Sequence, residues 1–130
     1  MKHTREELVK YRFERAKESL EEAIILANSN HWNTVSNRLY YSLFYAVSAL
    51  LIKHETQGTT HSGVKGQFHK EFIKSGIIDI EYGRLYNNLF NKRQEGDYGD
   101  FQTFDKETIE PLILAVKKFL ENIKSHLDLY

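Results

Sequence analysis

The segment from His31 to Lys53 constrains the fold most, because its apolar side chains cover a wide arc of a helix. One stripe at helical spacing consists of Trp32, Val35, Leu39, Leu43, Ala46 and Leu50. A second stripe, made of Tyr40, Phe44, Val47 and Leu51, lies beside the first. A helix with two neighbouring apolar stripes must bury both of them, so this segment is predicted to be the central helix of a bundle.

Four other segments show the same helical period. They cover about residues 4–27, 60–76, 79–93 and 105–127. No segment shows the sustained period-two alternation that is typical of a half-buried strand. The 130 residues therefore predict one all-α domain over 1–130, an up-and-down bundle of about five helices with short antiparallel connections.

Several helix ends carry recognisable signals. Thr4 with Glu7 resembles a capping box, and Thr60 is the expected cap of the third helix. Gly76 is expected to end the third helix. Pro111 fits the first turn of the last helix if Thr108 is the cap, or it kinks a helix that begins at Asp105.

Composition excludes several classes of function. The 18 basic residues balance the 18 acidic ones, so any contact with nucleic acid must be local. The absence of cysteine removes disulfides, thiolate zinc sites and cysteine nucleophiles. The six histidines show no metal-ligand spacing and no Gly-rich phosphate loop is present, so neither a metal nor a cofactor is predicted. Without a signal-like or membrane-spanning apolar run, we expect a cytoplasmic protein with no membrane contact.

The stretch Asn91-Lys92-Arg93-Gln94-Glu95-Gly96-Asp97-Tyr98 holds the strongest candidate site. Arg93 continues the apolar stripe of the fourth helix, four residues after Leu89, so its side chain is predicted to point toward the bundle. An inward guanidinium is costly unless an anion or a carboxylate meets it. Gly96 is expected to end the helix and to place Asp97 and Tyr98 in a loop beside Arg93.

Two interpretations of this group are open. In one, a buried ion pair and hydrogen bond pin the loop to the bundle. In the other, Arg93 binds a phosphate bidentately, Asp97 orients the guanidinium, and Tyr98 donates a hydrogen bond or stacks on a base. Asn37, Arg38 and Tyr41 form a polar side of the central helix that either packs on another subunit or lines a groove. His61 is either an exposed or capping residue, or it faces the same groove as Arg93.

At these residues the chain resembles a HEPN domain (higher eukaryotes and prokaryotes nucleotide-binding). It is most similar to the small, free-standing prokaryotic group often encoded beside a minimal nucleotidyltransferase. The matching segments occur in the order expected for that family, and they are Asn37 to Ala46, Thr60 to Val64, Phe68 to Gly76, Arg93 to Tyr98 and Ala115 to Leu120.

The resemblance implies a helical bundle that forms a homodimer, in which the helices around the arginine meet across a two-fold axis. Many family members are metal-independent ribonuclease toxins whose motif is an arginine followed a few residues later by a histidine. Arg93 matches the motif arginine, but Tyr98 stands after the four intervening residues. Tyrosine, with an ordinary pKa of about 10, is a poor general base near neutrality. Some of these toxins are silenced when the partner nucleotidyltransferase adenylylates a tyrosine near the motif, and Tyr98 is the nearest match.

Two functions follow from the resemblance. The favoured one is a HEPN module that binds a nucleotide or nucleic-acid phosphate near Arg93 and works with a separately encoded minimal nucleotidyltransferase in a toxin–antitoxin-like system. Its expected ligand contacts are Arg93, Tyr98, His61, Asn37, Arg38 and Tyr41. The alternative is a metal-independent ribonuclease toxin that cleaves single-stranded RNA with Arg93, while Asp97, Tyr98 or His61 substitutes for the missing histidine. The absent base favours the first function, since losing a general base typically costs on the order of a hundredfold in rate.

Overall fold

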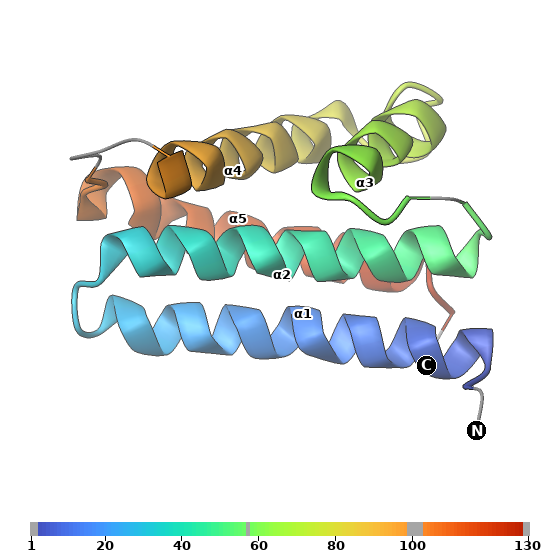
Figure 1. Ribbon diagram of the computed structural model, residues 1–130, viewed down its shortest axis with the longest axis horizontal. Coiled ribbons are helices and arrows are strands. Elements are labelled where there is room, and N and C mark those ends of the chain that lie inside the picture. Colours follow the sequence, from blue (N-terminus) through green and yellow to red (C-terminus); the bar gives the residue numbers. More distant parts are fainter. Residues whose placement is uncertain (1–2, 57, 99–102, 129–130) are drawn as a thin grey trace.

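The computed structural model describes residues 3–56, 58–98 and 103–128, with only the backbone described for 96–98. Five α-helices account for most of this part of the chain (Figure 1). They are α1 (Arg5–Ala27), α2 (Trp32–Lys53), α3 (His61–Phe68), α4 (Ile80–Tyr98) and α5 (Lys106–Ser125), and α3 continues directly into the π-helical turn η1 (His69–Ile73). No strand occurs among the described residues, so the predicted all-α fold is confirmed.

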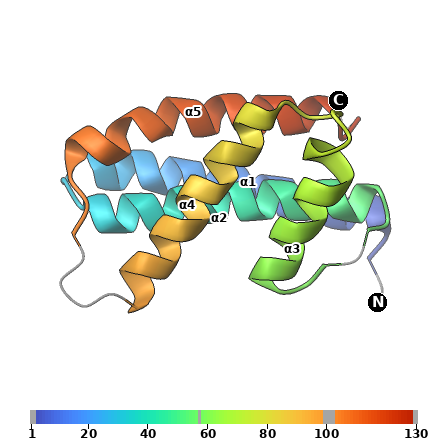
Figure 2. The same ribbon diagram turned by 90° about the horizontal axis from the view of Figure 1, so that it is seen from above.

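Helix α2 is central, as predicted. It packs against each of the other four helices. Figure 1 shows α1 lying antiparallel along one side of α2, with α3 and α4 on the opposite side. Figure 2 shows that α4 crosses α2 obliquely and that α5 runs alongside the α1–α2 pair. The C-terminal half of α4 therefore lies over the N-terminal half of α2, and the candidate site residues of the two helices lie close together there.

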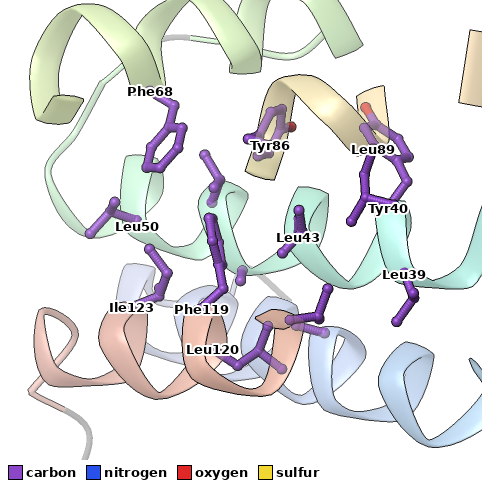
Figure 3. Close-up of a cluster of buried hydrophobic side chains, with 14 of the residues drawn as sticks. Leu39, Tyr40, Leu43, Leu50, Phe68, Tyr86, Leu89, Phe119, Leu120 and Ile123 are labelled. Carbon is purple, nitrogen blue, oxygen red and sulfur yellow. The ribbon is translucent and has the colours of Figure 1, made fainter. Parts of the chain in front are cut away.

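The core is built where aromatic rings from α3, α4 and α5 converge on the leucines of α2. Phe68 lies 5.5 Å from Tyr86 and 5.8 Å from Phe119, measured between ring centroids. Figure 3 shows these three rings grouped around Leu43 and Leu50. All five side chains are completely buried. Burial of side chains of this size contributes roughly 1.5–3 kcal/mol each, so this cluster fixes how α3, α4 and α5 sit on α2.

Most of the predicted helix ends are confirmed by hydrogen bonds. The Thr4 side chain accepts a bond from the Glu7 backbone N–H, and the Thr60 side chain accepts one from Gly63. Gly76 adopts a φ of 83° after η1, a conformation that favours glycine. Asp105 caps α5, which places Pro111 inside that helix and decides between the two starts considered for it.

The predicted end of the fourth helix is wrong. Helix α4 continues to Tyr98, so Gly96 lies inside the helix and Asp97 and Tyr98 are helical instead of forming a loop. A glycine in a helix interior costs only about 1 kcal/mol relative to alanine, which weakens a helix without terminating it. The side chains of Asp97 and Tyr98 lie outside the part of the chain that the structure describes.

Candidate functional site

Arg93 lies against two tyrosines of α2. The turns of α4 that precede Arg93 bury Tyr86, Leu89 and Phe90. Arg93 follows on the same face of the helix, so its side chain is directed toward α2. The Arg93 side chain is half-buried and its Nε atom is completely buried. Its guanidinium carbon is 5.5 Å from the ring centroid of Tyr40 and 5.7 Å from that of Tyr41. This is the range of a cation–π contact, which holds the arginine within the bundle without neutralising its charge.

His61 reaches the same pair of tyrosines from α3. It is the first residue of that helix, directly after the Thr60 cap. Its Nδ1 atom lies 2.7 Å from the hydroxyl oxygen of Tyr40. The imidazole packs 4.6 Å from the Phe44 ring and 5.8 Å from the Tyr41 ring, between centroids. His61 and Arg93 thus flank a shared aromatic surface on α2.

Tyr40 is the buried centre of this arrangement. Its side chain has no solvent exposure, and burial raises its pKa to about 12. A phenol with that pKa keeps its proton throughout the neutral range, so Tyr40 acts as a hydrogen-bonding group and not as a base.

Asn37 and Arg38 lie one turn before the tyrosines. The Arg38 guanidinium donates to Oδ1 of Asn37 at 2.7 and 3.2 Å and to Glu22 at 3.4 Å. Its guanidinium carbon lies 5.1 Å from the Tyr41 ring centroid. Tyr41 is therefore contacted by two guanidinium groups, those of Arg38 and Arg93.

A cavity of about 220 Å³ opens beside Arg93, between α2, α4 and Phe104, which lies just before α5. It is lined by Asn33, Thr34, Ser36, Asn37, Lys92, Arg93 and Phe104. The described lining carries two cations, several neutral hydrogen-bonding groups and no carboxylate. Its polar character and positive charge suit a small anion.

The structure brings together five of the predicted site residues: Arg93, His61, Asn37, Arg38 and Tyr41. Two of them, Arg93 and Asn37, line the cavity. Sequence reasoning missed its other lining residues, which are Asn33, Thr34, Ser36, Lys92 and Phe104. Asn33 had a detectable signal, since it lies four residues before Asn37 and hence on the same face of α2. Phe104 had none, because it is placed by a tertiary contact in which its backbone N–H donates to Oδ1 of Asn33 at 2.7 Å.

Within residues 3–56, 58–98 and 103–128, no three side chains of His, Asp or Glu gather where they could hold a metal ion. In the same part of the chain, no helix is long and apolar enough to cross a membrane. The described part of the chain is a helical bundle with a polar cavity beside Arg93, and the Arg93 guanidinium packs on two tyrosines of α2.

Comparison with known proteins identifies the class. The model of the HEPN domain matches residues 9–126, so the chain belongs to the HEPN domain family. A "UPF0332 protein" of Thermotoga maritima is 36% identical over 124 residues, which cover 95% of this chain and 94% of that protein. The protein named "Putative toxin MJ0142" of Methanocaldococcus jannaschii is 40% identical over 114 residues, covering 88% of this chain and 78% of that protein. "Putative toxin MJ0605" of the same organism is 31% identical, with 86% and 83% covered.

Proposed function

We propose that this protein is a HEPN module that binds a phosphate group of a nucleotide or nucleic acid at Arg93. It forms a homodimer, and it works with a separately encoded minimal nucleotidyltransferase in a toxin–antitoxin-like system. The observation that carries the proposal is the cavity of about 220 Å³ beside Arg93, in which Lys92 supplies a second cation.

The chemistry of the lining favours phosphate over other anions. A guanidinium can bind two phosphate oxygens at once, and an ammonium adds a compact positive charge. The amide of Asn37 and the hydroxyls of Thr34 and Ser36 can each donate a hydrogen bond to the remaining oxygens. A group with several acceptor oxygens uses all of these donors, whereas a chloride ion would not.

The partner part of the proposal is supported by the family and by two relatives that are named as toxins. The dimer part is supported by the partly buried aromatic face of α2, where Tyr41 and Tyr45 lie next to each other with ring centroids 6.1 Å apart. Light scattering is expected to report about twice the monomer mass of 15.3 kDa. A strict monomer at micromolar concentration would contradict the dimer.

The names of those two relatives also favour a second candidate, a metal-independent ribonuclease toxin acting on single-stranded RNA. That function needs a group that accepts the proton of the 2′-hydroxyl. Tyr40 keeps its proton at neutral pH because burial raises its pKa to about 12. Among the side chains described around Arg93, His61 is then the candidate base.

The binding proposal is tested by thermal unfolding with and without ATP, used as a phosphate-bearing probe. A ligand that binds only the folded state raises its stability in proportion to the logarithm of ligand concentration. We expect ATP to raise the melting temperature of the unmodified protein, and Arg93→Ala to abolish that shift. Arg84→Ala is the matched control, since Arg84 is an exposed arginine of the same helix, and it should leave the shift intact.

The choice between the two candidates is tested by expression in a bacterium without any partner. The binding function predicts normal growth with both Arg93 and Arg93→Ala. Growth arrest with RNA breakdown that disappears in Arg93→Ala would establish the ribonuclease and overturn the favoured function.

A further inference from the structure

Arg12 of α1 is a half-buried arginine with no carboxylate beside it. The other arginines of α1 and α2 are each paired with a glutamate, in the ion pairs Arg5–Glu55, Arg15–Glu18 and Arg38–Glu22. The neighbours of Arg12 one turn away on α1 are Leu8, Val9, Arg15 and Ala16, so its own helix offers no acidic partner. Within residues 3–56, 58–98 and 103–128, Arg12 makes no ion pair or hydrogen bond through its side chain. Partial burial of an unpaired guanidinium is costly, and an anion that met it would offset this cost.

A second cavity, of about 170 Å³, opens beside Arg12 between α1, α2 and the segment that joins α2 to α3. Its polar lining consists of Arg12 and three hydroxyl side chains, those of Ser48, Thr56 and Thr59. The rest of its described lining is apolar or glycine, namely Phe44, Leu51, Ile52, Gly58 and Val64. Ser48 is only 8% exposed, and its hydroxyl makes no hydrogen bond within the described part of the chain. The cavity thus combines one cation and three hydroxyls with an apolar wall, and no carboxylate lines it.

The segment that closes this cavity is anchored to α2 and to α3. The Thr56 backbone N–H donates to the carbonyl oxygen of Leu51 at 2.9 Å. Gly58 lies so close to both helices that an added Cβ atom would be 3.4 Å from the carbonyl oxygen of Gly63 and 3.5 Å from Cδ1 of Leu51. A wall fixed in this way needs little ordering when a ligand binds, so less binding energy is lost.

This cavity is separate from the one beside Arg93. The two cavities share no lining residue. Asn37 of the first and Ser48 of the second are eleven residues apart on α2, which corresponds to about 16 Å along the helix axis. Binding at Arg12 therefore does not depend on binding at Arg93.

We propose that the Arg12 cavity is a second ligand site, which binds an oxyanion carried on an apolar body. The guanidinium of Arg12 binds two oxygens of the anion at once. The hydroxyl of Ser48 donates to a further oxygen, and the threonines supply additional donors. The apolar body of the ligand packs against Phe44 and Ile52. Phosphate monoesters and carboxylates of aromatic compounds share this chemistry.

The proposal is tested by a ¹⁵N–¹H NMR titration with phenyl phosphate, following the backbone amides of Gly58 and Thr59. We expect saturable shifts of both signals, an affinity about tenfold weaker in Arg12→Gln, and an unchanged affinity in Arg93→Ala. Unmoved signals at millimolar phenyl phosphate, or an equal affinity in Arg12→Gln, would overturn the site. Shifts that disappeared in Arg93→Ala and persisted in Arg12→Gln would assign the anion to the Arg93 cavity and would also overturn it.

A milder variant and two further probes keep the test independent of the stability of Arg12→Gln. Ser48→Ala removes one hydroxyl donor and should weaken the binding of phenyl phosphate about threefold, and an unchanged affinity would contradict the role of Ser48. Benzyl alcohol has the aromatic body without the charge, so binding as tight as that of phenyl phosphate would overturn the oxyanion site. Benzoate distinguishes the two classes of oxyanion, because tighter binding of phenyl phosphate identifies a phosphate site and tighter binding of benzoate identifies a carboxylate site.

Discussion

The Tyr40 hydroxyl lies 2.7 Å from Nδ1 of His61 and so joins the central helix α2 to the first residue of α3. The same tyrosine ring contacts Arg93 of α4 at 5.5 Å. One buried side chain therefore belongs both to the core and to the candidate site, and it links the three helices that build the site.

Replacing Tyr40 with phenylalanine removes this hydroxyl and leaves Nδ1 of His61 without its partner. We expect Tyr40→Phe to lower the free energy of unfolding by about 1 kcal/mol, the usual contribution of such a hydrogen bond. Urea unfolding provides the measurement. Tyr11→Phe is the control, because Tyr11 is an exposed tyrosine of α1, and the loss of its hydroxyl should be nearly neutral. Equal destabilisation by the two variants would show that the Tyr40–His61 bond contributes nothing.

Gly83 allows α4 to approach the π-helical turn η1 closely. A Cβ atom at Gly83 would lie 3.0 Å from Cε1 of His69 and 3.1 Å from Cγ2 of Ile73. Gly83→Ala is therefore expected to destabilise the protein by roughly 1–3 kcal/mol, the cost of overpacking a filled site. Gly66→Ala is a contrasting control in α3, where an added Cβ meets nothing within 4 Å, and it should stabilise by about 0.5–1 kcal/mol. Calorimetric melting of both variants tests this, and a stabilised Gly83→Ala would contradict the close approach.

His69 makes the stability depend on pH. Burial lowers the pKa of His69 below its ordinary value of 6.5. The unfolded chain then binds a proton more readily than the folded one, so stability is full above about pH 6.5 and declines as the pH falls through the interval down to the folded-state pKa. Urea unfolding between pH 8 and pH 5 should show this decline, and His69→Gln should reduce it. An unchanged pH profile in His69→Gln would assign the decline to other groups.

The sequence predicts the helices well because their apolar periods are long and consistent. The two stripes of α2 identify the central helix, and the threonine caps mark the starts of α1 and α3 at their observed positions. The end of α4 is mispredicted because glycine is favoured just after a helix end but is also tolerated inside a helix. The residue type alone therefore does not distinguish Gly96, which lies inside α4, from Gly76, which has a positive φ after η1.

For the site, helical period predicts the inward direction of Arg93, since that follows from its place on the stripe of α4. The pairing of Tyr40 with His61 is not predictable in this way. Tyr40 reads as an ordinary core residue, and its hydroxyl meets His61 only because α3 folds back over α2. Phe104 likewise reaches the cavity through the hydrogen bond between its backbone N–H and Asn33.

The central claim is that a phosphate group binds in the cavity beside Arg93. The most direct measurement is a two-dimensional ¹⁵N–¹H NMR titration of the protein with ATP, following the side-chain amides of Asn33 and Asn37 and the Nε–H of Arg93. We predict that these signals shift together and saturate, and that the shifts at both asparagines are strongly reduced in Arg93→Lys, which cannot bind bidentately. ATP binding that leaves these signals unmoved, or no binding at millimolar ATP, would contradict the claim.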